Sequence, residues 1–169
     1  MCDYSLTGIP NRLAVEGEEL VTHRFQTGSI GMASANDVRA QVDREEEQRQ
    51  RERGLWKTFK RWLAGPAPEP LCAVCIAPGT SLVMMRVPEE LRRQYALNAI
   101  EDVTFTQLTA QPFQYRDAIQ FRTGRHILLH LLKEGLMFKV TRDVAERENS
   151  EMRGERGQNQ PAEVRYITK

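Results

Sequence analysis

The chain has 169 residues, of which 28% are charged and 40% hydrophobic, a composition typical of a soluble globular domain with some highly charged surface. Its formal net charge of +1 argues against a dedicated nucleic-acid-binding protein, which normally carries a marked basic excess. The sequence has no apolar run of about 18 residues and no secretory signal at its start, so we expect neither a membrane-spanning helix nor export. The three cysteines do not suggest a disulfide scaffold, and we expect a cytoplasmic protein with mostly reduced thiols.

Strand and turn signals come first in the chain. Residues 7–11 form a turn cluster, and residues 20–25 are rich in β-branched and aromatic side chains, which predicts a strand. The pattern then changes to helix, because Ser34 or Asn36 can cap a helix and residues 43–53 hold almost nothing apolar. We therefore expect an exposed, highly charged helix after the first β segment.

An aromatic and basic helix is predicted next. Residues 55–63 place large apolar side chains on one helical stripe and basic side chains on the other side. The stripe consists of Leu55, Trp56, Phe59, Trp62 and Leu63, and the basic side of Lys57, Lys60 and Arg61. The Pro-rich residues 65–70 end this helix and act as a stiff linker. We interpret residues 34–70 as a helical insertion with a Pro-rich linker.

The second half of the chain predicts a β-rich body. Strands are expected at residues 71–76, 81–87, 103–108, 118–122, 126–132 and 136–141, with a short helix at 88–97. Residues 126–132 also fit a helix, but a glycine turn on each side favours a strand. The predicted fold class is mainly β (α+β), a small antiparallel sheet or barrel-like meander with a helical insertion. The β domain comprises residues 1–33 and 71–144, and residues 145–169 are expected to be a polar tail without fixed structure.

The most reactive candidates are the three cysteines, Cys2, Cys72 and Cys75. Cys72 and Cys75 lie in one predicted strand, where residues three apart face opposite sides of a sheet, so their sulfurs should not converge. The simplest interpretation is two core thiols. If a first strand lay beside residues 71–76, Cys2 could meet Cys75 or Cys72 and form a disulfide or, with a histidine, a metal site. We predict no cofactor, because the number of metal ligands is short.

Cys2 also has a catalytic interpretation. Removal of Met1 would leave Cys2 as the N-terminal residue, and its thiol could act as a nucleophile with its own α-amine as base. Class II glutamine amidotransferases use this logic from a Met-Cys start, but they are much longer and continue with a glycine-rich strand, which is absent here. An N-terminal nucleophile hydrolase is therefore the least favoured alternative, and the prediction leans towards a protein that is not an enzyme.

The histidines offer little chemistry. His126 and His130 are four residues apart, a spacing that chelates one metal on a helix but separates the side chains by about 13 Å on a strand. Because a strand is favoured here, we interpret both as surface or half-buried polar residues. His23 lies in the predicted strand 20–25 and is interpreted as structural.

The aromatic helix at residues 55–63 is the other candidate site. Trp56, Phe59, Lys60 and Trp62 could dock into a groove on a partner protein or onto an anionic membrane surface. A stripe of this kind is more often the side of a helix that packs on its own core. Three large aromatic residues in so short a segment nevertheless favour keeping a protein partner, with peripheral membrane contact as the alternative.

Several segments resemble a group of small uncharacterised bacterial proteins. They are the start Met1-Cys2-Asp3-Tyr4-Ser5-Leu6, the run Leu20-Val21-Thr22, residues 73–80 and Tyr115-Arg116-Asp117-Ala118. The similarity omits the charged helix and the tail. It implies a bacterial cytoplasmic origin, carries no activity to transfer, and points to Cys2 and Cys75 rather than Cys72.

Together these observations predict a non-enzymatic accessory protein that docks a protein partner through its sheet and its aromatic helix. The competing hypothesis is a thiol- or metal-binding module built on Cys2 and Cys75.

Overall fold

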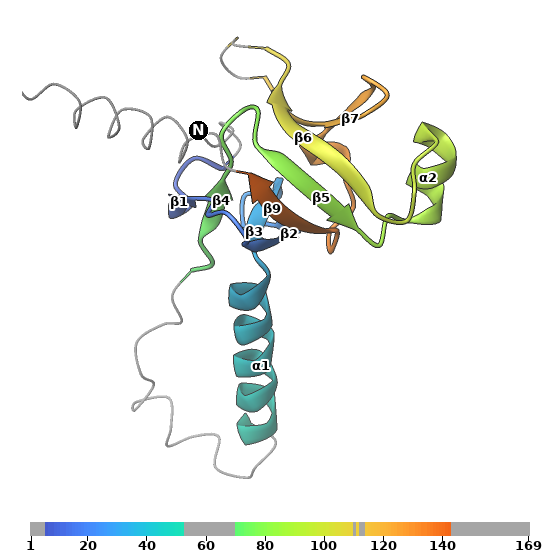
Figure 1. The fold of residues 1–169 in the computed structure, drawn as a ribbon. Helices are drawn as coiled ribbons and strands as arrows, with labels where there is room; N and C mark the ends of the chain where they lie inside the picture. Colours follow the sequence, from blue (N-terminus) through green and yellow to red (C-terminus); the bar gives the residue numbers. More distant parts are fainter. Residues whose placement is uncertain (1–5, 53–69, 110, 112–113, 143–169) are drawn as a thin grey trace, which may run out of the picture.

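The structure, a computed structural model, describes residues 6–52, 70–109, 111 and 114–142, which form one mixed sheet of nine strands with two α-helices (Figure 1). The strands are β1 (Asn11–Leu13), β2 (Glu19–Arg24), β3 (Ile30–Ser34), β4 (Ala73–Cys75), β5 (Ser81–Met85), β6 (Glu101–Gln107), β7 (Asp117–Phe121), β8 (His126–Leu128) and β9 (Met137–Arg142). The helices are α1 (Ala35–Glu52) and α2 (Glu89–Tyr95), and one turn of 3-10 helix, η3 (Leu129–Leu131), follows β8. The predicted α+β class with a helical insertion is confirmed.

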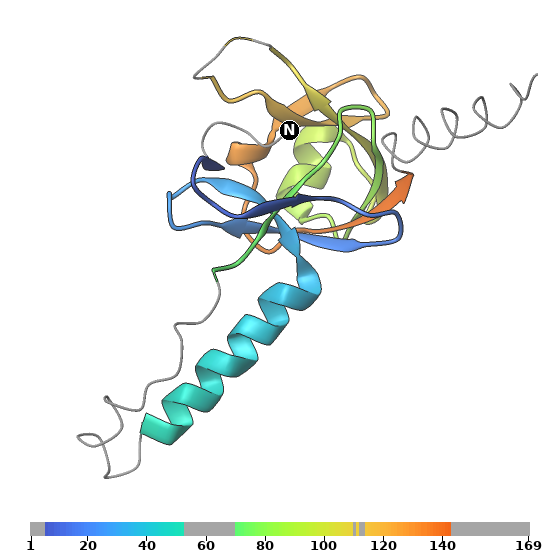
Figure 2. The same cartoon turned by 90° about the vertical axis from the view of Figure 1, so that its left-hand side faces the viewer.

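The strand order is β1-β4-β3-β2-β9-β5-β6-β7-β8, and the sheet is antiparallel except at one edge. There β1 and β4 run parallel, with Leu13 opposite Cys75, which differs from the antiparallel sheet that we expected. A parallel pair needs a long crossover, and the chain between the two strands, which includes β2, β3 and α1, supplies it. At the β8 edge of the sheet, η3 contacts β3, which lies near the other edge. The sheet is therefore curled and not flat (Figure 2).

The main core fills the inner side of the curled sheet. Side chains alternate along the strands, so that every second residue of β5 and β9 is buried. Phe138 of β9 is fully buried and lies opposite Leu20 of β2 on one side and Met84 of β5 on the other. Leu91 and Tyr95 of α2 pack against this core from one end. Phe138 therefore joins the two halves of the sheet.

A second cluster lies on the opposite face of β3 and β4. It consists of the buried residues Leu6, Phe25, Ala33 and Ala73, with Ile9, Val38 and Leu71 packed against it. Because the main core lies on one face of β3 and this second cluster on the other, all five residues of β3 are buried. Gly31 leaves no room for a side chain, since an added Cβ would lie 2.7 Å from Leu6 Cδ1.

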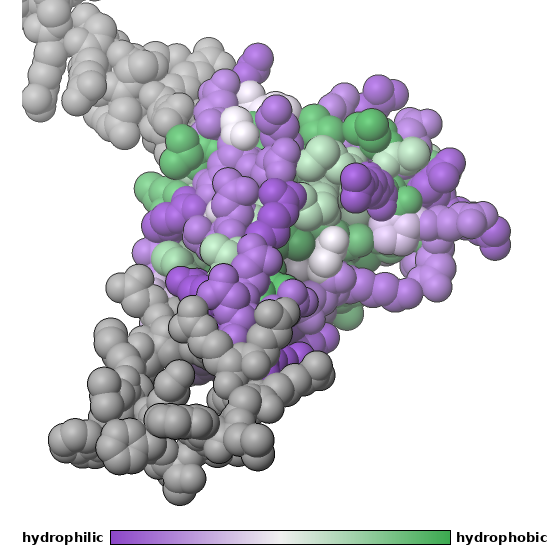
Figure 3. Space-filling view, turned by 90° about the horizontal axis from the view of Figure 1, so that it is seen from below, coloured by the Kyte–Doolittle hydropathy of each residue, from purple (hydrophilic) through white to green (hydrophobic). Residues whose placement is uncertain are grey.

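The helical insertion leaves and rejoins the sheet at neighbouring strands. Ala33 of β3 pairs with Ala73 of β4, and α1 begins directly after β3. The helix contacts β2 and β3 at its start and then extends away from the sheet (Figures 1 and 2). Figure 3 views the molecule from this side and shows hydrophilic side chains gathered over α1.

One predicted strand is shorter than expected. Residues 126–132 were expected to form a strand throughout, but β8 ends at Leu128 and η3 follows. Leu129 and Leu132 are both buried, whereas Leu131 is 62% exposed. Burial at every third residue fits the three-residue turn of a 3-10 helix, which overrides the strand alternation. The predicted helix at 55–63 and the tail at 145–169 lie outside the described residues.

Candidate functional site

Cys75 is the predicted site residue with the clearest chemistry. It is the last residue of β4, is only 5% exposed and is disulfide-bonded. The amide of Ala14 donates a hydrogen bond of 2.9 Å to the Cys75 carbonyl. The condition set for a meeting of Cys2 with Cys75, a first strand beside residues 71–76, is met by the β1–β4 pair, although no strand was predicted at residues 11–13. The expectation of mostly reduced thiols does not hold at Cys75.

Cys72 has a different environment. Its thiol is free and half-buried, and Sγ lies 3.6 Å from the carbonyl oxygen of Ala73, to which it can donate a weak hydrogen bond. The prediction that Cys72 and Cys75 do not join each other is therefore confirmed. Cys2 lies outside the described residues. Within residues 6–52, 70–109, 111 and 114–142, no three His, Cys, Asp or Glu side chains are placed to hold a metal ion.

An ion pair anchors β1 next to these cysteines. The two terminal nitrogens of the Arg12 guanidinium, Nη1 and Nη2, donate to the two carboxylate oxygens of Glu18, and the amide of Val15 donates to Glu18 Oε2 at 3.1 Å. Arg12 Nη2 also lies 4.0 Å from Asp37 Oδ2 in the first turn of α1. Arg12 therefore ties together β1, the turn before β2 and the base of the insertion.

This geometry shifts both pKa values. The hydrogen bond to Glu18 is the main cause that raises the pKa of Arg12, partly opposed by its burial. Burial acts to raise the pKa of Glu18, but the hydrogen bonds from Arg12 and Val15 and the Arg12 charge together lower it below the ordinary 4.5. Glu18 is thus held as a carboxylate in the folded protein.

A Glu18→Gln variant is expected to be less acid-sensitive than the wild type. Because the Glu18 pKa is lowered by folding, its stabilising contribution is complete above pH 4.5 and disappears as the pH falls through the folded-state value. At neutral pH we expect the variant to lose about 1 kcal/mol of unfolding free energy. The loss is no larger because solvent partly screens the charge of Arg12. Urea unfolding across a pH series measures both effects.

The control for this experiment is Glu46→Gln, which removes an exposed carboxylate of α1. This control should follow the wild-type pH curve. Parallel pH curves for wild type and Glu18→Gln would show that the Arg12–Glu18 pair does not couple stability to pH.

The histidines take structural places, as the sequence predicts for His23. His23 Nδ1 lies 3.0 Å from Glu134 Oε1, which also accepts the Arg24 amide at 3.0 Å. His126 is exposed on β8, whereas His130 is half-buried in η3 and stacks on Tyr115 with ring centroids 3.9 Å apart. We expected His126 and His130 to lie in one strand. They do not, because β8 ends at Leu128, between the two residues.

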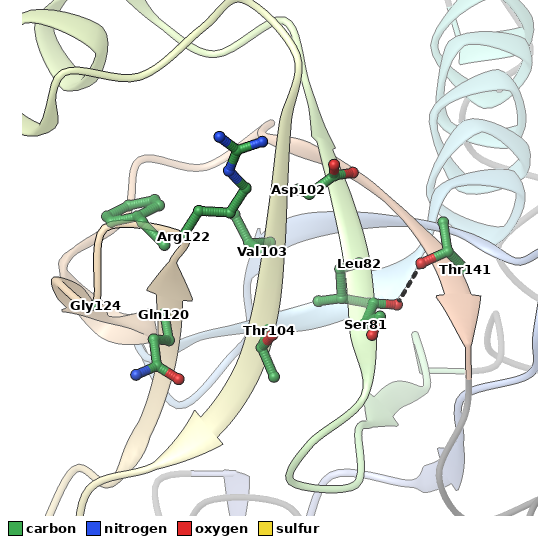
Figure 4. Close-up of a pocket in the computed structure, with 10 residues that line it drawn as sticks. Ser81, Leu82, Asp102, Val103, Thr104, Gln120, Arg122, Gly124 and Thr141 are labelled. Carbon is green, nitrogen blue, oxygen red and sulfur yellow. Dashed lines mark hydrogen bonds between the residues drawn. The ribbon is translucent and has the colours of Figure 1, made fainter.

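The sheet also carries a polar hollow of about 520 Å³ that sequence reasoning missed (Figure 4). Its polar lining comes from the outward-facing side of β5, β6, β7 and β9 and the residue after β7, namely Ser81, Asp102, Thr104, Gln120, Arg122 and Thr141. Ser81, Thr104 and Gln120 lie in one cross-strand row, because Thr104 pairs with Ser81 on one side and with Gln120 on the other. The Thr141 hydroxyl donates to the Ser81 carbonyl at 3.0 Å.

The hollow offers hydrogen-bonding groups rather than a reaction centre. Its lining contains hydroxyl, amide, carboxylate and guanidinium groups, and neither cysteine nor histidine. A small polar molecule could rest on it, but its lining offers no activated nucleophile of the thiol–imidazole or hydroxyl–imidazole kind. Trp56, Phe59, Lys60 and Trp62, the predicted partner-binding residues, lie outside the described residues, so the structure neither joins them to this hollow nor separates them from it.

Comparison of the chain with protein-family models, with curated proteins and with solved structures finds no match in any of the three. In the part of the chain that the structure describes, neither helix is both long and apolar enough to cross a lipid bilayer.

Proposed function

We propose that this protein is a non-enzymatic accessory protein that binds a protein partner through residues 55–63, with α1 as the stalk that leads to them. The observation that carries the proposal is the exposure of α1. After its first residue, Ala35, each α1 side chain that the structure describes is exposed or only half-buried, and the helix extends away from the sheet (Figure 1).

A helix with so few buried side chains contributes little to the stability of the folded protein. Most of the stability of a protein helix comes from packing an apolar face, and among the α1 side chains that the structure describes only Val38 packs against the second cluster. A polar helix that projects from a body is typical of an element that reaches towards something else. The exposed α1 therefore supports a role away from the sheet and its two clusters, which we call the β-body (the described parts of residues 6–34 and 70–142).

The chemistry of residues 55–63 defines the partner. Their spacing predicts that Trp56, Phe59 and Trp62 share one helical stripe, and aromatic residues of this type dominate the binding energy of protein interfaces. Lys57, Lys60 and Arg61 would flank that stripe. The complementary surface is an apolar groove with carboxylates along its rim.

The alternative function, a thiol- or metal-binding module built on Cys2 and Cys75, has one supporting observation. Cys75 is disulfide-bonded, which favours thiol chemistry over metal binding, because a sulfur in a disulfide is not available as a thiolate ligand.

A cytoplasmic location stays part of the main proposal and is tested by fractionating cells of the source organism.

The binding proposal is tested with a Trp56→Ala/Trp62→Ala variant of the full chain. Proteins captured from a source-cell lysate are purified, and their affinity for wild type and variant is measured by calorimetry. We expect the double variant to bind at least about 10-fold more weakly, because each buried aromatic anchor contributes about 2 kcal/mol or more. A matched control is Ile100→Ala/Leu131→Ala, which removes two exposed apolar side chains from the β-body.

The control variant should bind like the wild type, and far-ultraviolet circular dichroism should show the same β content in all three proteins. Equal affinity of wild type and the tryptophan variant would contradict the proposal. So would tryptophan-dependent sedimentation with vesicles of phosphatidylglycerol and phosphatidylcholine in the absence of any bound protein, because that result assigns the segment to a membrane surface.

A further inference from the structure

We propose that Cys2 is the disulfide partner of Cys75, and that this bond reversibly fastens the N-terminal arm, residues 6–15, to β4. The chain has three cysteines, of which Cys72 is free and Cys75 is bonded. A bond within the chain therefore requires Cys2. The proposal is independent of the partner-binding role of residues 55–63.

The faces of β4 support this assignment. Val74 points into the main core, whereas Ala73 belongs to the second cluster together with Leu6. Because side chains alternate along a strand, Cys75 points to the same face as Ala73. Its sulfur is therefore on the side of β4 where the N-terminal arm packs.

The described start of the arm lies on this face of the sheet. Leu6 is 7% exposed, and its Cδ1 approaches Gly31 of β3 so closely that a Cβ there would lie 2.7 Å away. The Ile9 amide donates to the Leu6 carbonyl at 3.1 Å, so the chain turns immediately before β1. Four residue steps separate Cys2 from Leu6, a length of chain that spans up to about 13 Å when extended.

Besides the disulfide, the arm is held by a short strand pair, by the Arg12–Glu18 ion pair and by the buried side chains of Leu6 and Ala14. The β1–β4 pair covers three residues in parallel register, flanked by hydrogen bonds from the Ala73 amide to Pro10 at 2.7 Å and from the Ala14 amide to Cys75 at 2.9 Å. The side chain of Leu6 is the arm's main contribution to the second cluster. A three-residue edge strand opens more readily than the central strands of a sheet, so a covalent bond at the start of the arm adds to its protection.

The switching chemistry is a thiol–disulfide exchange. A dithiol reductant attacks one sulfur of the Cys2–Cys75 bond, forms a mixed disulfide and then closes its own cyclic disulfide, releasing two protein thiols. Two electrons and two protons pass from the dithiol to the protein. Release of the arm would uncover the second cluster and turn β4 into an open edge strand.

The first test is peptide mapping by mass spectrometry of the purified full chain, digested without reductant after free thiols are alkylated. We expect a peptide pair that links Cys2 to Cys75, and alkylation of Cys72 alone. A link from Cys75 to Cys72, a Cys75–Cys75 link between two chains, or a Cys75 that is alkylated would overturn the proposal.

The second test is hydrogen–deuterium exchange of the same protein before and after treatment with dithiothreitol. We expect peptides that cover the arm and β4 to exchange at least about 10-fold faster after reduction, while β9 peptides stay protected. Cys2→Ser should exchange fast without reductant, and the matched control Cys72→Ser should behave like the oxidised wild type. Equal protection of the arm in the oxidised, reduced and Cys2→Ser proteins would show that the bond does not control it.

Discussion

Replacing Phe138 with alanine is expected to lower the free energy of unfolding by about 3–5 kcal/mol. The Phe138 ring is fully buried in the middle of the sheet order, with Leu20 of β2 on one side and Met84 of β5 on the other. A truncation here leaves a cavity between the two halves of the sheet. Urea denaturation, followed by circular dichroism, measures the loss.

The comparison for Phe138→Ala is Leu131→Ala in η3. Leu131 is 62% exposed, so its truncation should change stability by no more than about 0.5 kcal/mol. A loss of less than about 1 kcal/mol for Phe138→Ala would mean that β9 does not join the two halves of the core.

A Thr22→Val variant is expected to lose about 2 kcal/mol although the side-chain volume hardly changes. The buried Thr22 hydroxyl accepts a 2.8 Å hydrogen bond from the Leu136 amide and donates one of 2.8 Å to the Lys133 carbonyl. Valine can do neither, so a buried amide would lose its acceptor. Thermal unfolding monitored by circular dichroism checks this expectation.

Thr22→Ser is the matched control, because it keeps the hydroxyl and removes only a methyl group. We expect serine to be the milder change of the two. If valine proved as stable as serine, the hydroxyl would not be what fastens β2 to the turn between η3 and β9.

The strands with clear alternation could be predicted from the sequence, whereas β1 and β3 could not. β5, β6 and β9 each bury roughly every second residue, and this period marks them in the sequence. β1 spans only three residues, which is too short to show the period. β3 does not show it either, because all five of its residues are buried, between the main core on one face and the second cluster on the other. Their assignment depends on contacts with residues distant in the chain.

The candidate site divides in the same way. Cys75 could be selected from the sequence because a thiol is chemically distinctive, but no local pattern indicates that it is oxidised. The polar hollow could not be recognised, because Thr104 and Gln120 are what any solvated strand face carries. Only the register of β5, β6 and β7 gathers such residues into one surface.

The pairing of Ala33 with Ala73 has a consequence for how this protein can vary. The sheet register at this point is set by the two flanking strands and not by the segment that joins them. The entropy cost of closing such an excursion rises by only about 0.6 kcal/mol for each doubling of its length. Relatives could therefore exchange, shorten or extend this segment without disturbing the scaffold, and a foreign peptide could be grafted between the same two alanines.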